Sequence, residues 1–326
     1  MQTLLKQTQA YALLKNEIQN GRYGHAYLLK YDDARNLRTA LKLFAKLFFA
    51  CDERKTAAQK RISDLIDAEN FSDCLCYPEP NKKFSVDDAE KIREECTLNP
   101  VESEKKVLLI EDFAEANTQT QNKLLKLLEE PPQGVVFLLG ATTVFPILTT
   151  VLSRVRTLEI QPFKAEDIEA CLTRLYGDAF DTNALSVCAA ASNGSLGEAQ
   201  TALEGGEFNG FLQSVFSLCL SPLSKLPSLA RKMGEAKRPK ELLSLLRIVF
   251  RDALLIKTGV RNSNLLLANK AEEIQAVAKK FTATALLYAQ EAISEAEKQV
   301  KFNAVFPQCI ELCIAKIFEK NKAITQ

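Results

Sequence analysis

The segment Asn122–Arg156 constrains the fold of this chain more than any other part of the sequence. It begins with leucines at helical spacing, and Pro131–Pro132 ends the helix that they indicate, because a residue before proline resists the helical conformation. After a turn at Gln133–Gly134, Val135–Leu139 follows as an unbroken apolar run. Such a run is typical of a strand that is buried on both faces of a parallel sheet. The segment therefore predicts a helix packed on a parallel sheet.

The first half of the chain alternates strand-like and helix-like segments. The predicted strands are Ala26–Leu29, Phe71–Tyr77, Val107–Ile110, Val135–Leu139 and Leu158–Ile160, and the helices between them include Leu37–Ala50 and Val86–Cys96. Ser85 is placed to cap the second of these helices. Strands separated by helices indicate an α/β fold with a parallel sheet and right-handed crossovers.

The strand signal ends after Pro162, and the remainder of the chain reads as helices. Three short helices over 165–203 indicate a small helical domain, and the glycine pair Gly205–Gly206 marks its expected end. We therefore expect an α/β domain followed by all-α structure. The expected domain boundaries are 1–162, 163–206 and 207–326.

A long helix of the last domain carries two apolar stripes. The first contains Leu242, Leu245, Leu246, Val249, Ala253 and Ile256, and the second contains Leu243, Phe250 and Leu254. Apolar residues on both sides of one helix indicate burial from both sides. Two alternatives are open, because the helix lies either inside a bundle or at a contact with another subunit. In the second case, a charge at Phe250 or Leu254 weakens assembly more than it lowers stability.

The composition excludes several classes of protein. Lys and Arg number 42 against 41 Asp and Glu, and this balance argues against a protein that holds DNA alone through a broad basic face. No apolar run has the length of a membrane span, and the N-terminus lacks a signal-peptide core, so we expect a cytoplasmic protein. Nine cysteines without paired spacing fit a reducing cytosol. A single histidine argues against a multi-histidine metal site or a histidine-based triad.

Three motifs resemble those of the AAA+ clamp-loader subunits of bacterial DNA polymerase III. They are the Glu129–Pro132 helix end, the Thr142–Thr143 pair after the buried strand, which corresponds to sensor 1, and Ser153–Arg154, which corresponds to the arginine-finger motif. Moderate similarity covers residues 20–50, and weaker similarity covers the collar-like segments 251–259 and 301–317. The resemblance implies a RecA-like AAA+ domain, a small helical lid and a C-terminal helical collar. Among the subunit types of this family, the chain most resembles the delta-prime type.

The segment that corresponds to the phosphate-binding loop has lost the residues that a nucleotide needs. No glycine occurs between His25 and Gln133, whereas a phosphate cradle needs glycines for close backbone approach and a lysine for charge. By register, Leu37 takes the place of the family's lysine and Arg38 that of its threonine. Asp32–Asp33 adds negative charge to the same loop. We therefore predict a degenerate P-loop, with no nucleotide cofactor and no ATP hydrolysis by this chain.

Two further elements of the family's nucleotide site are also altered. The Walker B strand of the family ends in Asp-Glu, but the corresponding strand here ends in Glu111–Asp112, the reverse order. We interpret this pair as a solvated loop. Gly197 lies in the slot of the lid arginine called sensor 2. The basic residues Arg35, Arg38, Lys42 and Lys46 are likewise expected on a solvated helix face.

The zinc site of many bacterial clamp-loader subunits is not expected in this chain. Only Cys51 lies at the corresponding place, and Cys74, Cys76 and Cys96 do not form the closely spaced pairs that tetrahedral zinc favours. We therefore expect no metal and interpret these cysteines as small buried apolar residues.

The resemblance implies that Arg154, with Ser153 beside it, is an arginine finger that acts in trans. An arginine fork fits phosphate oxygens, and such a finger stabilises charge on the γ-phosphate of a neighbouring subunit. The alternative is that Arg154 and Arg156 are ordinary surface charges at the end of a helix. The implied function is that of a non-catalytic subunit in a hetero-pentameric ring with gamma/tau-like ATPase subunits and a delta subunit. The ring loads the sliding clamp onto primed DNA.

Two other functions stay open at this point. The chain could be an active AAA+ motor of the gamma/tau type, which the missing Gly-Lys-Thr sequence argues against. It could also be the clamp-opening delta type, and the Glu129–Pro132 and Ser153–Arg154 motifs favour delta-prime over it.

Overall fold

A computed structural model describes residues 1–325 except 54, 206–207, 236–237, 260–264 and 303. The chain divides into two compact units, Met1–Pro162 and Phe163–Gln326. Within the described residues, no helix is both long enough and apolar enough to cross a membrane.

The first unit is built on a five-stranded parallel sheet in the order β2-β3-β4-β1-β5. The strands are β1 (Ala26–Tyr31), β2 (Cys74–Tyr77), β3 (Lys106–Ile110), β4 (Val135–Ala141) and β5 (Arg156–Ile160). Every residue of β4 is buried, as predicted for its apolar run, because the strand lies between two neighbours and under helices on both faces.

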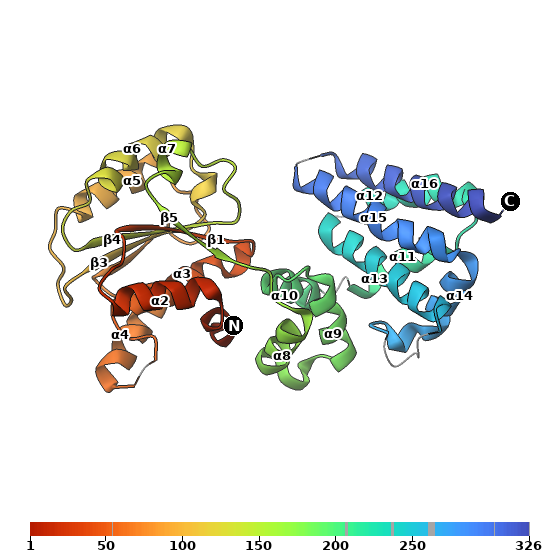
Figure 1. The fold of residues 1–326 in the computed structure, drawn as a ribbon, viewed down its shortest axis with the longest axis horizontal. Helices are drawn as coiled ribbons and strands as arrows, with labels where there is room; N and C mark the ends of the chain where they lie inside the picture. Colours follow the sequence, from red (N-terminus) through yellow and green to blue (C-terminus); the bar gives the residue numbers. More distant parts are fainter. Residues whose placement is uncertain (54, 206–207, 236–237, 260–264, 303, 326) are drawn as a thin grey trace. The chain divides into compact units, whose positions relative to one another are not determined.

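Helices cover both faces of this sheet. They are α1 (Gln2–Lys6), α2 (Gln9–Gln19), α3 (Leu37–Phe48), α4 (Ala57–Asp67), α5 (Val86–Glu95), α6 (Thr118–Glu129) and α7 (Thr149–Leu152), with short 3-10 turns η1 (Ala34–Asn36) and η2 (Phe113–Glu115). Helices α5, α6 and α7 lie on one face, and α2, α3 and α4 lie on the other (Figure 1). Ser85 caps α5 as predicted, in a capping box with Asp88.

The strand predicted over Phe71–Tyr77 is shorter than expected and begins only at Cys74. The residues before it make a turn in which the Cys74 N–H donates to the Phe71 carbonyl (3.0 Å). The buried Asp73 carboxylate accepts hydrogen bonds from the backbone N–H groups of Val101 (2.6 Å) and Ser103 (2.8 Å). Asp73 therefore serves to fix the loop before β3 and does not extend the strand.

The second unit contains helices and 3-10 turns in its described part. The helices are α8 (Ala165–Tyr176), α9 (Thr182–Ala191), α10 (Leu196–Glu204), α11 (Phe208–Leu220), α12 (Leu226–Gly234), α13 (Pro239–Lys257), α14 (Ala271–Lys280), α15 (Ala283–Lys301) and α16 (Phe306–Thr325). The 3-10 turns are η3 (Gly177–Ala179), η4 (Leu223–Lys225) and η6 (Ala268–Lys270). The α/β fold followed by all-α structure agrees with the predicted fold class.

The two stripes of α13 both lie inside the helical bundle. The first stripe is buried except for Ile256, which is partly buried. Leu243 and Phe250, from the second stripe, are also buried, and the Phe250 ring meets the Phe281 ring edge to face with centroids 5.3 Å apart. The subunit-contact alternative is therefore wrong for Phe250, because its neighbours belong to its own unit. Leu254 is only partly buried against the same core.

The expected division of the second unit at residues 206–207 stays a prediction, and Gly206 lies outside the described residues. Polar contacts link α10 and the turn before it to α13 and its N-cap residue. The Arg238 guanidinium donates to the Thr201 carbonyl (3.0 Å), and the Asn193 side chain donates to the Ser244 hydroxyl (3.1 Å). An added Cβ at Gly205 would collide with Arg238, so this glycine permits the close approach.

Candidate functional site

The loop between β1 and α3 is held by hydrogen bonds to the carboxylate of Asp33, a residue of the same loop. Asp33 is buried, and its side chain accepts a hydrogen bond from the backbone N–H of Asn36 (3.1 Å) and from the Tyr31 hydroxyl (3.0 Å). The Asn36 amide also donates to it (2.9 Å). A helix N-terminus normally offers such N–H groups to phosphates. Here the Asp33 carboxylate already accepts a hydrogen bond from a backbone N–H group in the turn that precedes α3.

Leu37, which the resemblance aligns with the family's phosphate-binding lysine, is part of the core. Its side chain is buried and packs with Leu41 against Gly140 of β4. A Cβ added to Gly140 would lie 2.8 Å from Leu41 Cδ1 and 3.2 Å from Leu37 Cδ1. The start of α3 therefore packs directly on the strand, and the side chain at this position is a buried hydrocarbon instead of a cation.

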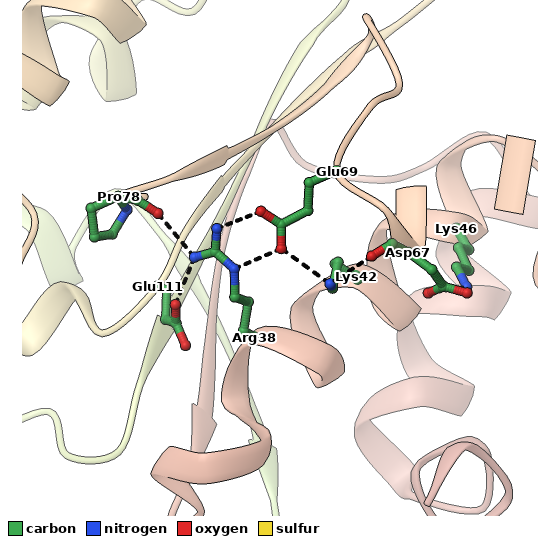
Figure 2. Close-up of polar contacts among 7 residues, drawn as sticks. All are labelled: Arg38, Lys42, Lys46, Asp67, Glu69, Pro78 and Glu111. Carbon is green, nitrogen blue, oxygen red and sulfur yellow. Dashed lines mark hydrogen bonds and ion pairs between the residues drawn. The ribbon is translucent and has the colours of Figure 1, made fainter. Parts of the chain in front are cut away.

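Arg38, one position further, binds two carboxylates from other segments of the unit (Figure 2). Its Nε and Nη2 donate to the two oxygens of Glu69 (2.7 and 2.6 Å), which is a bidentate pair. Its Nη1 donates to Glu111 Oε2 (2.7 Å) at the end of β3 and to the Pro78 carbonyl (2.9 Å). The guanidinium links the start of α3 to the end of β3, and these are the two positions that the resemblance aligns with the family's Walker A threonine and a Walker B acid.

The ion pairs continue along α3. Lys42 Nζ donates to Glu69 (3.1 Å) and to the Asp67 carbonyl (2.9 Å), and Lys46 Nζ pairs with the Asp67 carboxylate (2.6 Å). The hydrogen bond from Arg38 holds the pKa of Glu69 below its usual value, against the opposite effect of burial. We call Arg38, Lys42, Glu69 and Glu111 the α3 charge cluster.

The α3 charge cluster corrects two sequence interpretations. Arg38, Lys42 and Lys46 were expected on a solvated helix face, but each binds an acid of its own unit, and Lys46 is only 2% exposed. Glu111 was expected in a solvated loop, but its side chain is 24% exposed and paired with Arg38. The acids that neutralise these cations are distant in sequence, so helical periodicity alone could not reveal them.

Ser153 and Arg154 lie directly after α7, on the surface of the unit. Arg154 Nη1 donates to the Thr150 carbonyl (2.6 Å) and to the Ser153 hydroxyl (3.1 Å), and its Nη2 forms an ion pair with Glu129 of α6. About a third of the Arg154 side chain is exposed. The structure therefore brings the two predicted site residues together with the Glu129–Pro132 motif. It also leaves part of the guanidinium accessible.

The cysteines of the first unit are free thiols with little exposure to solvent. Cys51, Cys74 and Cys96 are buried and Cys76 is half-buried, and all are free thiols. Burial raises the pKa of Cys51 to about 11 and that of Cys76 to about 12, so neither forms the reactive thiolate at neutral pH. In the part of the chain that the structure describes, no group of three or more His, Cys, Asp and Glu residues is arranged to hold a metal ion.

Two family models match the chain over separate ranges. One, described as "DNA polymerase III, delta subunit", covers residues 6–164, and the other, described as "DNA polymerase III, delta subunit, C terminal", covers residues 210–305. The chain belongs to the clamp-loader family of DNA polymerase III. The parallel sheet covered by helices and the helical second unit agree with the fold that the resemblance implied.

Curated relatives are subunits of the same polymerase. The DNA polymerase III subunit tau of Bacillus subtilis is 23% identical over 341 residues, which cover 93% of this chain and 59% of the relative. The subunit delta' of Bacillus subtilis is 28% identical over 164 residues, half of each chain, and the Escherichia coli subunit tau is 30% identical over 200 residues, which cover 57% of this chain and 30% of the relative. The chain thus spans less than two thirds of the relatives' length.

A solved structure also aligns with nearly the whole chain. It is a gamma subunit-related protein from Thermotoga maritima, 18% identical, with a TM-score of 0.44 and coverage of 97% of this chain and 99% of that one.

Sequence reasoning missed Glu69 and Asp33 as parts of this site. Glu69 lies 31 residues after Arg38, in a segment that reads only as charged helix, so no local signal marks it. Asp33 could have been found, because an aspartate three residues before Asn36 at a turn is a recognisable capping position. It was instead interpreted only as unfavourable charge near a phosphate.

Proposed function

We propose that this clamp-loader family member is a delta-prime-type subunit that does not hydrolyse ATP itself and supplies Arg154 to a neighbouring ATPase subunit. The observation that carries the proposal is the α3 charge cluster. A guanidinium bound to Glu69 and Glu111 takes the place of the groups that would hold Mg²⁺ and phosphate. Moreover, Glu111 is no longer available to a metal while it pairs with Arg38.

The second support is the position of Arg154. Ser153, Thr150 and Glu129 hold the guanidinium from one side, and the side chain keeps about a third of its surface in solvent. Arg is always charged and its planar fork can donate to two phosphate oxygens. An arginine that is held on one side and exposed on the other can donate its remaining N–H groups to a phosphate of another subunit.

The partners follow from this proposal. The chain forms a hetero-pentameric ring in the cytoplasm with gamma/tau-like ATPase subunits and a delta subunit, and the ring loads the sliding clamp onto primed DNA. Residues 163–206 act as the lid and 207–326 as the collar, which joins the subunits. The chain needs no nucleotide cofactor of its own.

Replacement of the finger tests this function. Arg154→Ala in the reconstituted ring should leave assembly intact and lower hydrolysis at the adjacent ATPase site by about 10³-fold or more, because a trans arginine contributes that much in other NTPases. The measurement is the clamp- and DNA-stimulated ATPase rate. Arg156→Ala is the matched control, since Arg156 is a nearby exposed arginine paired with Glu17. Equal hydrolysis by the Arg154→Ala and wild-type rings would reject the finger.

Two observations favour other subunit types. Several relatives are named tau or gamma, which keeps a motor function open, and micromolar binding of ATP by the isolated chain would support it over our proposal. Both family models carry the name of the delta subunit. Strong capture of the sliding clamp by this chain alone would support that type.

A further inference from the structure

We infer that Glu129 is a positioning residue for Arg154, a role that rests on the proposed function of Arg154 as a trans finger. Glu129 is the last residue of α6, and its carboxylate forms an ion pair with Arg154 Nη2. The contact joins two motifs that lie 25 residues apart in the sequence.

The position of Glu129 is fixed by the residues around it. Leu128, its neighbour, is buried in the core of the unit, and its carbonyl is within hydrogen-bond distance of His25 Nε2 (2.9 Å). The helix ends at the next residue, because Pro131 and Pro132 follow Glu130. The carboxylate therefore extends from a helix end that is anchored through both its side chains and its backbone.

The segment that carries Arg154 is anchored to the same helix. The Gln121 amide of α6 donates to the Pro146 carbonyl (3.1 Å), and its Oε1 accepts from the Leu148 N–H (2.9 Å), just before α7. Val151 of α7 is completely buried against the core that contains Leu128. The distance between Glu129 and the backbone of Arg154 is thus set by packing and does not depend on flexible loops.

The ion pair selects one orientation of a long side chain. Thr150 and Ser153 hold Nη1, and Glu129 holds Nη2, so the guanidinium plane is fixed from one side. An arginine has five N–H donors, and Nε has no acceptor among the described residues. The ion pair with Glu129 thus orients the guanidinium and leaves the Nε–H and one N–H of Nη2 able to donate to another group. Preorganisation of a rotamer-rich side chain lowers the entropic cost of its next contact.

The test compares variants of Glu129 in the reconstituted ring. Glu129→Ala should lower stimulated ATP hydrolysis by about three- to tenfold, because immobilising one long side chain costs that much. The half-saturating ATP concentration and the assembly of the ring should stay unchanged. Glu129→Gln keeps an acceptor oxygen and should restore most of the rate. Glu130→Ala is the matched control, since Glu130 is an exposed neighbour without a side-chain bond to another described residue.

A double-variant cycle distinguishes positioning from other effects. In the Arg154→Ala background, Glu129→Ala should have no further effect, because the residue acts only through the guanidinium. A wild-type or faster rate for Glu129→Ala alone, or an additional loss in the Arg154→Ala background, would overturn the inference. If Arg154→Ala itself has no effect, the proposed function fails and the inference with it. If only Glu129→Ala is without effect, the finger stands and the positioning role falls.

Discussion

The Arg38 side chain connects three segments of the first unit through its nitrogen atoms. Glu69 follows α4, Glu111 follows β3 and Pro78 follows β2, and all three contact one guanidinium at the start of α3. The side chain is 13% exposed, so these contacts are poorly screened by solvent. An arginine at this position therefore fills the candidate site and also holds its surroundings together.

Replacement of Arg38 should destabilise the protein. In Arg38→Ala, Glu111 loses its cation and Glu69 keeps only Lys42, so we expect a loss of about 2 kcal/mol at pH 7, below the value for a fully buried pair. Chemical denaturation measures the loss, and Arg93→Ala, at an exposed arginine of α5, is the control. A difference of less than about 0.5 kcal/mol between the two variants would contradict a structural role for the cluster.

The same variant should respond differently to acid. Arg38 lowers the pKa of Glu69 in the folded protein below the ordinary value of 4.5. Stability from this pair is therefore present above pH 4.5 and is lost as the pH falls through the lower folded value. The difference in the free energy of unfolding between wild type and Arg38→Ala should therefore become smaller as the pH falls below 4.5. The free energy of unfolding as a function of pH provides the measurement.

At the scale of elements, the sequence predicted most of the sheet because its strands are apolar runs. Val135–Leu139 and Val107–Ile110 could be found in this way, and β4 is longer than predicted only by Gly140 and Ala141. The partners of polar side chains could not be predicted. Glu69 reaches Arg38, and Asp73 fixes the loop before β3, only after the chain has folded. Hydrophobic periodicity predicts which face of a helix or strand is buried, but it does not predict which charged side chains form ion pairs.

The contact between α3 and β4 gives a test at this scale. Gly140→Ala should cost about 1–2 kcal/mol, because its Cβ would lie 2.8 Å from Leu41 Cδ1 and the buried Leu41 side chain, or α3 with it, would have to shift. Gly210→Ala is the matched control. Gly210 lies in helix α11, a Cβ added there has no atom within 4 Å, and alanine should stabilise the protein by about 0.5–1 kcal/mol. Thermal unfolding compares the two. Equal effects of both variants would refute the close packing of α3 on β4.

At the scale of the whole molecule, the start of α3 is filled by ion pairs between side chains of its own unit, whereas the Arg154 side chain is about a third exposed. The α3 charge cluster neutralises its own cations, and the chain as a whole carries a net charge of only +1. The family could be predicted from the motifs around Arg154. The subunit type could not, because the curated relatives that match the chain include tau, gamma and delta' subunits.

The most direct test of the central claim is a single-turnover count of ATP hydrolysed per clamp-loading event. Rings are assembled with the wild-type chain or with Arg154→Ala, and all other subunits are unchanged. We predict that the variant ring hydrolyses one ATP fewer in the fast phase, while the remaining sites turn over at the wild-type rate. An unchanged count, or hydrolysis of nucleotide bound to this chain itself, would contradict the account.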